Sequence, residues 1–474
     1  MVRIGVAAFV MGLVLVSSAP TRADETYEHA PIHYLSATAT DPVARLQRRL
    51  DRGGLTLSRD PKNGYLSAVL RELNVPASSQ SLVFSKTSFQ RDRISPNNPR
   101  ALYFDDDTYV GYVPGGDVIE LASTDPQLGT VFYTLDQPKG APAEKSSPEK
   151  APPAQPRLVR QTHTCLQCHG STMTRDVPGL LIRSVYPDAD GQPVLSAGTF
   201  LTTQQSPFAE RWGGWYVTGR HGLQRHMGNV VVKDERATAA PTAALTPTPT
   251  PAAGGSPSSL LDVDAGANVT DLSGKFDTSA YLAGTSDMVA LMVFTHQAQT
   301  HNLMTRANYQ VRVALRDEEA MNEALGRGAA GAGAGAPAAH SESTLSRIRD
   351  AGEPLVRQML FCDEAALGKV RGAGDFDREF EARGPRDARG RSLRELDLKR
   401  RLFRYPCSYL IYSAQFDALP VPVKDYVYRR LWEVLSGADT GPDFSHLTAA
   451  TRKAIVEILL ETKAGLPDYW KKRQ

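Results

Sequence analysis

The sequence lacks several features that would point to common classes of protein. Its formal net charge is only +2 over 474 residues, so charge gives no reason to expect a nucleic-acid or acidic partner. After the N-terminal segment, no run approaches the ~20 apolar residues of a transmembrane helix, and we expect no later span. There is no G-x-S-x-G, P-loop or Rossmann fingerprint, which leaves no motif for a hydrolase or a nucleotide enzyme. Cysteines are scarce too, with four in the chain, and their positions therefore carry much of the information.

Two of the cysteines lie in the segment Cys165-Leu166-Gln167-Cys168-His169, a C-x-x-C-H motif. This spacing is typical of c-type haem attachment. Each thiol can form a thioether to one edge of the porphyrin, and the adjacent imidazole becomes the proximal iron ligand. A thioredoxin-like site would need a βαβ setting, and a zinc site would need a second ligand pair at a regular distance. The chain shows neither pattern, so the motif predicts one covalent haem c held by Cys165, Cys168 and His169.

The N-terminus has the pattern of a signal peptide. Residues 1–3 give a short basic start, residues 4–16 form an apolar run, and Thr21-Arg22-Ala23 is a small-x-small cleavage site before Asp24. The apolar run is too short for a permanent membrane span, although an uncleaved anchor is the alternative. Because covalent haem c is attached outside the cytoplasm, both observations predict a periplasmic protein with no transmembrane span after cleavage.

Composition and low-complexity stretches suggest how the chain is divided. Its 474 residues correspond to about three domains. Hydrophobic residues make up 41% and charged residues 22%, which is ordinary for a globular protein. Three stretches rich in Pro, Thr, Ala or Gly predict linkers or loops, because such composition cannot bury enough surface to become ordered. We expect a signal peptide (1–23), an N-terminal α+β region (24–136), a Pro-rich linker (137–157), a haem-binding region (158–236), a Pro/Thr/Ala-rich linker (237–259) and an α-helical C-terminal domain (260–474) with a Gly/Ala loop (326–339).

Aromatic and β-branched runs bounded by turn residues predict strands, and apolar residues at helical spacing predict helices. In the N-terminal region we expect helices at 42–52 and 64–73 and strands at 81–89, 101–104, 109–113, 118–122 and 130–135. In the haem-binding region we expect a helix at 158–169, a hairpin of 181–186 with 193–199 and a strand at 212–218. In the C-terminal domain we expect helices from 286 or 287 to 315 and at 355–367, 393–403, 424–436 and 449–462. The fold class is therefore α+β, with strands and helices around the haem segment and a mainly helical region after it.

The ligand on the opposite side of the iron is not fixed by the motif. A Met ligand raises the reduction potential of a haem and suits an electron carrier, whereas a second His lowers it. The candidates are Met227, His226 and His221 in one window and His301 on the long predicted helix. His296 and His301 lie about 140° apart on that helix, so they cannot both reach one metal. For each histidine, the alternative is a structural residue held by hydrogen bonds.

Three other features carry weaker information. Cys362 and Cys407 can form a disulfide in an oxidising compartment or stay two buried thiols, and the sequence leaves both open. Asp105-Asp106-Asp107 lacks the spacing and the glycine of a calcium loop, so it predicts a hairpin turn. The Arg-rich run 376–404 alternates in sign and predicts a solvated helical surface.

Residues 163–171 resemble the haem-binding segment of cytochrome c family proteins. A wider resemblance, to a group of exported bacterial proteins with a cytochrome c-like domain, covers residues 80–135, 160–230 and 280–470. It is carried by the stretches FAERWGGWYVTGRHG, VALMVFTHQAQTHNLMTRANYQ and FRYPCSYLIYSAQFDALP. The resemblance implies haem binding and electron transfer, with Cys165, Cys168 and His169 at the family positions, and implies no substrate. The chain departs from a compact cytochrome in its size and in lacking one obvious Met ligand.

Three functions are compatible with these features. The first is a periplasmic cytochrome that passes single electrons between redox partner proteins, which needs only the one motif. The second is a peroxidase-like haem oxidoreductase, in which Arg220-His221 and Arg225-His226 act over an open iron position. A two-haem peroxidase would need a second C-x-x-C-H, which the sequence lacks. The third is a haem-based sensor whose helical C-terminal domain contacts a partner. We favour the electron carrier because it assumes least.

Overall fold

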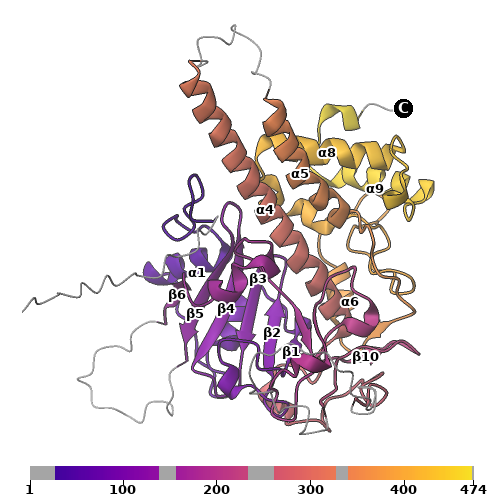
Figure 1. Ribbon diagram of the computed structural model, residues 1–474. Helices are drawn as coiled ribbons and strands as arrows, with labels where there is room; N and C mark the ends of the chain where they lie inside the picture. Colours follow the sequence, from indigo (N-terminus) through magenta and orange to yellow (C-terminus); the bar gives the residue numbers. More distant parts are fainter. Residues whose placement is uncertain (1–26, 138–155, 233–260, 327–339, 472–474) are drawn as a thin grey trace, which may run out of the picture.

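The computed structural model describes residues 27–137, 156–232, 261–326 and 340–471 (Figure 1). The predicted signal peptide and nearly all of the two linkers and the Gly/Ala loop lie outside these residues. The described part has a seven-stranded antiparallel sheet and a helical C-terminal region, so the predicted α+β class is confirmed. None of the described helices is long and apolar enough to cross a membrane.

The sheet is built mainly from the N-terminal region, and its strand order is β6-β5-β4-β3-β2-β1-β9. The strands are β1 (Ser81–Val83), β2 (Arg100–Phe104), β3 (Thr108–Tyr112), β4 (Val118–Asp125), β5 (Gly129–Asp136), β6 (Leu158–Gln161) and β9 (Trp215–Tyr216). The Asp105 carboxylate accepts the backbone N–H groups of Asp107 and Thr108, which confirms the predicted turn between β2 and β3. Strands β6 and β9 come from the predicted haem-binding region, so this region and the N-terminal region share one sheet.

The register places different helices on the two faces of the sheet. Phe104, Tyr109, Ala122 and Phe132 lie in one row across β2 to β5, with their side chains on the same face. Helix α4 (Met288–Ala324) packs on this face, and the ring of Phe294 lies 5.3 Å from that of Phe104 and 5.4 Å from that of Tyr109. On the opposite face, Tyr133 donates to Asp41, the N-cap of α1 (Pro42–Asp51).

Helix α4 is the central element of the C-terminal region (Figure 1). It has 37 residues, begins at the N-cap Asp287 as predicted, and is buried on most sides as far as Ala314. Figure 1 shows α5 running beside its C-terminal half, with α8 and α9 beyond α5. The remaining α-helices are α2 (Leu66–Glu72), α3 (Leu166–His169), α5 (Glu342–Met359), α6 (Phe376–Glu381), α7 (Ala414–Asp417), α8 (Val421–Ser436) and α9 (Ala449–Thr462). The predicted helices at 42–52, 64–73, 424–436 and 449–462 are thus confirmed.

Four short strands form two further antiparallel pairs in the described residues. Strand β7 (Arg183–Val185) pairs with β8 (Thr199–Leu201), which confirms the predicted hairpin with a shift at its second strand. The Asp188 carboxylate closes the turn between them by accepting the N–H groups of Asp190 and Gln192. Strand β10 (Gly219–Arg220) pairs with β11 (Arg371–Gly372) and joins the haem-binding region to the C-terminal region.

Three predicted helices are wrong in whole or in part. Residues 158–169 are not one helix, because Leu158–Gln161 pair with the edge of β5 and only Leu166–His169 are helical. Residues 393–403 form a loop, in which the Asp397 carboxylate accepts two backbone N–H groups and Leu398 has a φ of 54°. The helix expected at 355–367 begins at Glu342 and ends at Met359, since Phe361 and Asp363 have positive φ values.

The Arg-rich run 376–404, expected to be a solvated helical surface, is helical only in α6, and although Arg378, Arg389 and Arg404 are exposed, one of its arginines is buried. Arg394 is only 6% exposed. Its guanidinium lies 4.8 Å from the ring centre of Phe380 and 4.2 Å from that of Tyr409, and it pairs with Asp106. Cation–π contacts and this ion pair hold the charge inside the fold, so the run has a structural role at this position.

Candidate functional site

The C-x-x-C-H motif forms a single helical turn, α3, directly after the edge strand β6. The backbone N–H of His169 donates to the carbonyl of Cys165 at 2.9 Å, which closes the turn. Cys165 is half-buried and Cys168 is exposed, and both are free thiols. Burial is the main cause that raises the pKa of the Cys165 thiol, to about 11. Two unbonded thiols and an imidazole therefore share one short turn at the edge of the sheet.

The hydrogen bonds of His169 fix which ring nitrogen is available to a ligand. Its Nδ1 lies 2.9 Å from the carbonyl oxygen of Gly179, and the N–H of Gly179 donates to the His169 carbonyl at 2.8 Å. Because a carbonyl only accepts, Nδ1 must carry the hydrogen, and Nε2 keeps its lone pair. Burial lowers the pKa of His169, which favours the neutral ring. This is the arrangement of a metal-binding histidine whose second nitrogen is held by a backbone carbonyl.

Asn302 of α4 holds the backbone that orients His169. Its Oδ1 accepts the N–H of Leu180 at 2.8 Å, and its Nδ2 donates to the Leu180 carbonyl at 2.6 Å. The neighbouring Gly179 has no side chain, and a Cβ there would lie 2.4 Å from the Asn302 Oδ1. The His169 ring also packs against Phe132 of β5, with ring centres 5.0 Å apart. The sheet and α4 thus fix the histidine from two sides.

The donor set at this turn fits a c-type haem. Cys165 and Cys168 offer free thiols for two thioethers, and His169 presents a neutral Nε2 as proximal ligand. A haem held there would supply one-electron chemistry, while the protein sets its orientation and its electrostatic surroundings.

The structure engages both ring nitrogens of His221 and the Nδ1 of His226 in other contacts, while the Nε2 of His226 is buried without a hydrogen-bond partner among the described residues. His221 donates from Nδ1 to the Gln224 carbonyl at 2.9 Å and accepts the Asn268 N–H at Nε2, also at 2.9 Å. His226 has the opposite arrangement to His169, because its Nδ1 accepts the N–H of Gly228 at 3.0 Å. Its neutral ring therefore carries the hydrogen on Nε2, where a metal would have to bind. Burial lowers the pKa of His226 to about 3, so this ring is neutral.

Met227 and His301 are also engaged elsewhere. The Met227 sulfur accepts the Ser184 hydroxyl at 3.3 Å, and the side chain is buried in a small apolar cluster. His301 lies with Nδ1 2.7 Å from the Gln415 Oε1 and Nε2 2.8 Å from the Asp106 carbonyl. His296 is held in the same way, by Gln204 at 2.7 Å and Ser408 at 2.8 Å. Both histidines of α4 therefore have the structural role that was the alternative to ligation.

The segment 219–229, which holds His221, His226 and Met227, and the C-x-x-C-H motif lie at different turns of α4. Thr218 accepts the N–H of Met288 at the start of the helix, whereas Leu180, next to the His169 partner Gly179, is bound by Asn302. These points are separated by 14 residues of helix, about 21 Å. None of the contacts described above for Met227, His226, His221 and His301 involves residues 165–169. The structure therefore places Met227, His226 and His221 away from the motif, whereas His301, next to Asn302 on α4, is held by Gln415 and Asp106.

The basic residues that accompany the two histidines of this window do not point to a reaction centre. Arg225 pairs with Asp264 and donates to the Gln224 carbonyl at 2.9 Å. Arg220 is exposed on β10, whose partner strand is β11. Arg225 is thus held by local contacts, and Arg220 is an exposed residue of a paired strand.

Cys362 and Cys407 are two separate thiols in the structure, and both are buried. Burial is the first cause that raises the pKa of each thiol, to about 12. Neither is therefore a ready nucleophile at neutral pH.

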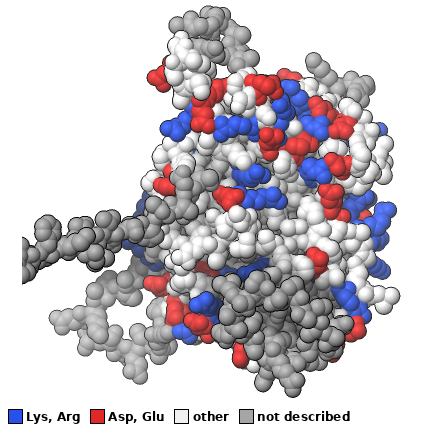
Figure 2. Space-filling model, viewed as in Figure 1, with Lys and Arg blue, Asp and Glu red and all other residues white. Residues whose placement is uncertain are grey.

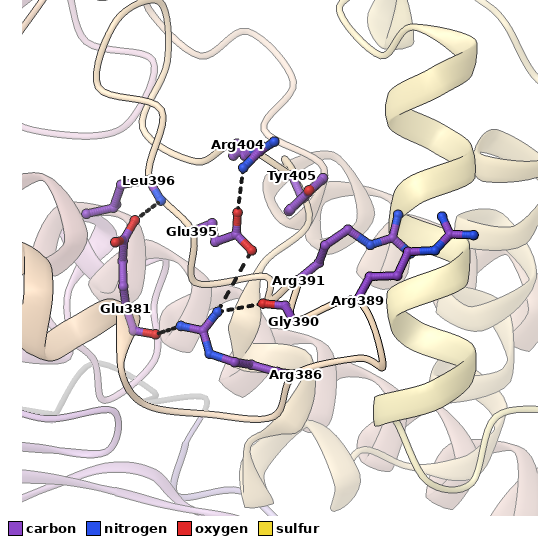
Figure 3. Close-up of a pocket in the computed structure, with 9 residues that line it drawn as sticks. All are labelled: Glu381, Arg386, Arg389, Gly390, Arg391, Glu395, Leu396, Arg404 and Tyr405. Atoms are coloured by element: carbon purple, nitrogen blue, oxygen red, sulfur yellow. Dashed lines mark hydrogen bonds and ion pairs between the residues drawn. The ribbon is translucent and has the colours of Figure 1, made fainter.

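A cavity of about 610 Å³ opens in the Arg-rich loop (Figure 3). Four arginines line it, but each guanidinium donates to a carboxylate or a carbonyl. The pairs are Arg386 with the Gly390 carbonyl at 2.8 Å, Arg389 and Arg391 with Glu457 at 3.0 and 2.9 Å, and Arg404 with Glu395 at 2.9 Å. Figure 2 likewise shows positive and negative side chains interspersed on the described surface of this view. The cavity is thus an ion-pair network and has no free cationic group for an anionic ligand.

Sequence reasoning identified the motif but missed the residues that support it. Gly179 and Asn302 lie 10 and 133 positions after His169, and no motif marks either one. A Pro-Gly pair shortly after the motif, Pro178-Gly179, was the only local signal. No protein-family model, curated protein or solved structure matches this chain.

Proposed function

We propose that this protein is a periplasmic c-type cytochrome that attaches one haem through Cys165 and Cys168, binds its iron through His169, and transfers single electrons between partner proteins. The observation that carries the proposal is the hydrogen bond from His169 Nδ1 to the Gly179 carbonyl. It leaves Nε2 as the ligand atom and adds to the basicity of the ring. The two free thiols of the same turn provide the attachment points.

The residues around the motif support this role in different ways. Asn302 and Phe132 restrict the imidazole, so the iron would keep one orientation in both oxidation states. Cys168 is exposed, so the attachment edge lies at the surface, where a partner protein can approach it.

A second candidate is a haem protein with an open iron position, either a peroxidase-like oxidoreductase or a sensor. It is favoured by one observation: His221, His226, Met227 and His301 are all committed to other partners. The two candidates differ in the coordination number of the iron and can be separated by spectroscopy.

The test uses the full-length, signal-cleaved protein produced together with a haem c attachment system. Pyridine haemochrome and optical spectra are recorded for the wild type, the Cys165→Ser/Cys168→Ser double variant and Cys362→Ser as a matched thiol control. We expect covalent haem in the wild type and in Cys362→Ser, and its loss in the double variant. A wild-type protein without covalent haem would contradict the proposal.

Electron paramagnetic resonance of the ferric protein then separates the candidates. A six-coordinate low-spin iron supports the electron carrier, and a high-spin iron supports the open-position alternative. His169→Ala should abolish the native spectrum in either case, because it removes the proximal ligand.

A further inference from the structure

A partly buried ion pair crosses the same face of the sheet against which His169 packs. Arg100 of β2 pairs with Glu120 of β4, and the two side chains are only 17% and 14% exposed. Glu120 also accepts the Gln90 side-chain amide at 3.1 Å. The Arg100 Nε is buried and has no hydrogen-bond partner among the described residues. Both charges are therefore held with little access to water, where their fields are screened less than at the surface.

Gly111 makes this pairing possible. Strand β3 lies between β2 and β4, and Gly111 stands opposite both Leu102 and Glu120. A Cβ at position 111 would lie 2.3 Å from the Arg100 guanidinium, so any larger residue would displace it. The absence of a side chain on β3 thus lets Arg100 reach two strands across the sheet.

The register brings the ion pair close to the motif. Glu120 stands opposite Thr134 of β5, and Phe132 is the diagonal neighbour of Glu120 on the same face. Phe132 in turn packs against His169. Phe132 thus connects the ion pair to the imidazole on one face of the sheet.

We infer that Arg100 and Glu120 act on the haem site with opposite signs, so that their pairing holds the reduction potential of the bound iron between the values that either charge alone would give. This inference rests on the proposed haem attachment. With both charges present their effects largely cancel. Removing Glu120 leaves a positive charge that disfavours ferric iron and raises the potential, and removing Arg100 leaves a negative charge that lowers it.

The size of the effect follows from the burial of the pair. In a partly buried setting with an effective dielectric constant of about 20, one unpaired charge roughly 12 Å away changes a one-electron equilibrium by about tenfold. For one electron this is a shift of about 59 mV. The signs are opposite for the two single variants, which a merely structural effect would not produce.

The experiment measures the midpoint potential of the loaded holoprotein by spectroelectrochemistry. The variants are Glu120→Gln, Arg100→Gln, the double variant and Arg100→Lys. Asp317→Asn is the control, because it breaks an exposed ion pair with Arg347 far along α4. We expect a higher potential in Glu120→Gln and a lower one in Arg100→Gln, and values near the wild type for the other three. Circular dichroism and haem content establish that each variant folds and is loaded.

The outcomes distinguish this inference from the proposed function. Loaded single variants with unchanged potentials, or with shifts of the same sign, would overturn the role of the ion pair and leave haem attachment intact. If Arg100→Gln fails to fold, Glu120→Gln still decides the sign, because it must raise the potential, and Arg100→Lys, which keeps the charge, must leave it unchanged. A wild-type protein without covalent haem would overturn both proposals.

Discussion

Asn302 allows the strongest quantitative prediction, because one side chain satisfies two buried backbone groups beside His169. Asn302→Ala leaves the N–H and the carbonyl of Leu180 without partners in a buried setting. A buried polar group that loses its partner costs about 1–3 kcal/mol, so the two groups together cost roughly 4 kcal/mol. Alanine is a better helix former than asparagine, which offsets about 0.6 kcal/mol of this loss. The free energy of unfolding should therefore fall by about 3 kcal/mol.

Urea unfolding followed by circular dichroism measures this change. Asn322→Ala on the half-exposed end of the same helix is the matched control, and we expect its unfolding free energy to stay within about 0.5 kcal/mol of the wild type. Asn302→Ala should also broaden the haem signals of the loaded protein, because the Gly179 carbonyl no longer fixes the ring of His169. A loss of less than 1 kcal/mol, or an unaltered haem spectrum, would refute the role assigned to Asn302.

Three further predictions follow from single side chains. His226→Ala and Met227→Leu should leave the spin state of the ferric protein unchanged, because both residues are bound elsewhere; a low-spin to high-spin conversion in an electron paramagnetic resonance spectrum would contradict this. Burial raises the pKa of Glu364 to about 7, so the folded protein keeps a proton that the unfolded chain releases near pH 4. The bound proton stabilises the folded state at low pH, and this contribution is lost as the pH rises through about 7. The free energy of unfolding of the wild type, measured in urea at pH 5 and at pH 8, should differ by up to roughly 3 kcal/mol because of this group. Glu364→Gln should remove that difference. Asp287→Ala removes the N-cap of α4 and the acceptor of the Gly374 N–H, and should lower the unfolding free energy by about 2–3 kcal/mol; a change below 0.5 kcal/mol would count against the cap.

Local patterns were sufficient where the deciding interactions are themselves local. The strands at 101–104, 109–113, 118–122 and 130–135 were predicted from β-branched and aromatic runs between turn residues, and all four are present. The start of α4 was predicted from Asp287, whose carboxylate caps the first turn. In each case the residues that decide the structure are close together in the sequence.

Predictions failed where a distant partner decides the conformation. Residues 158–161 looked helical, but the unpaired edge of β5 turns them into a strand. Arg394 looked like a solvated charge, but Phe380, Tyr409 and Asp106 enclose it. Periodicity and composition do not report such partners, because the contacts form only when the chain has folded.

The candidate site shows the same division. The sequence by itself determined the motif, because the spacing of Cys165, Cys168 and His169 is local and is the spacing typical of haem c attachment. Only the tertiary structure decided which histidine nitrogen is free, because that depends on whether a carbonyl faces Nδ1, as at His169, or an N–H, as at His226. The environment of the site, from Asn302 to the Arg100–Glu120 pair, likewise depends on which residues the fold brings together across the sheet.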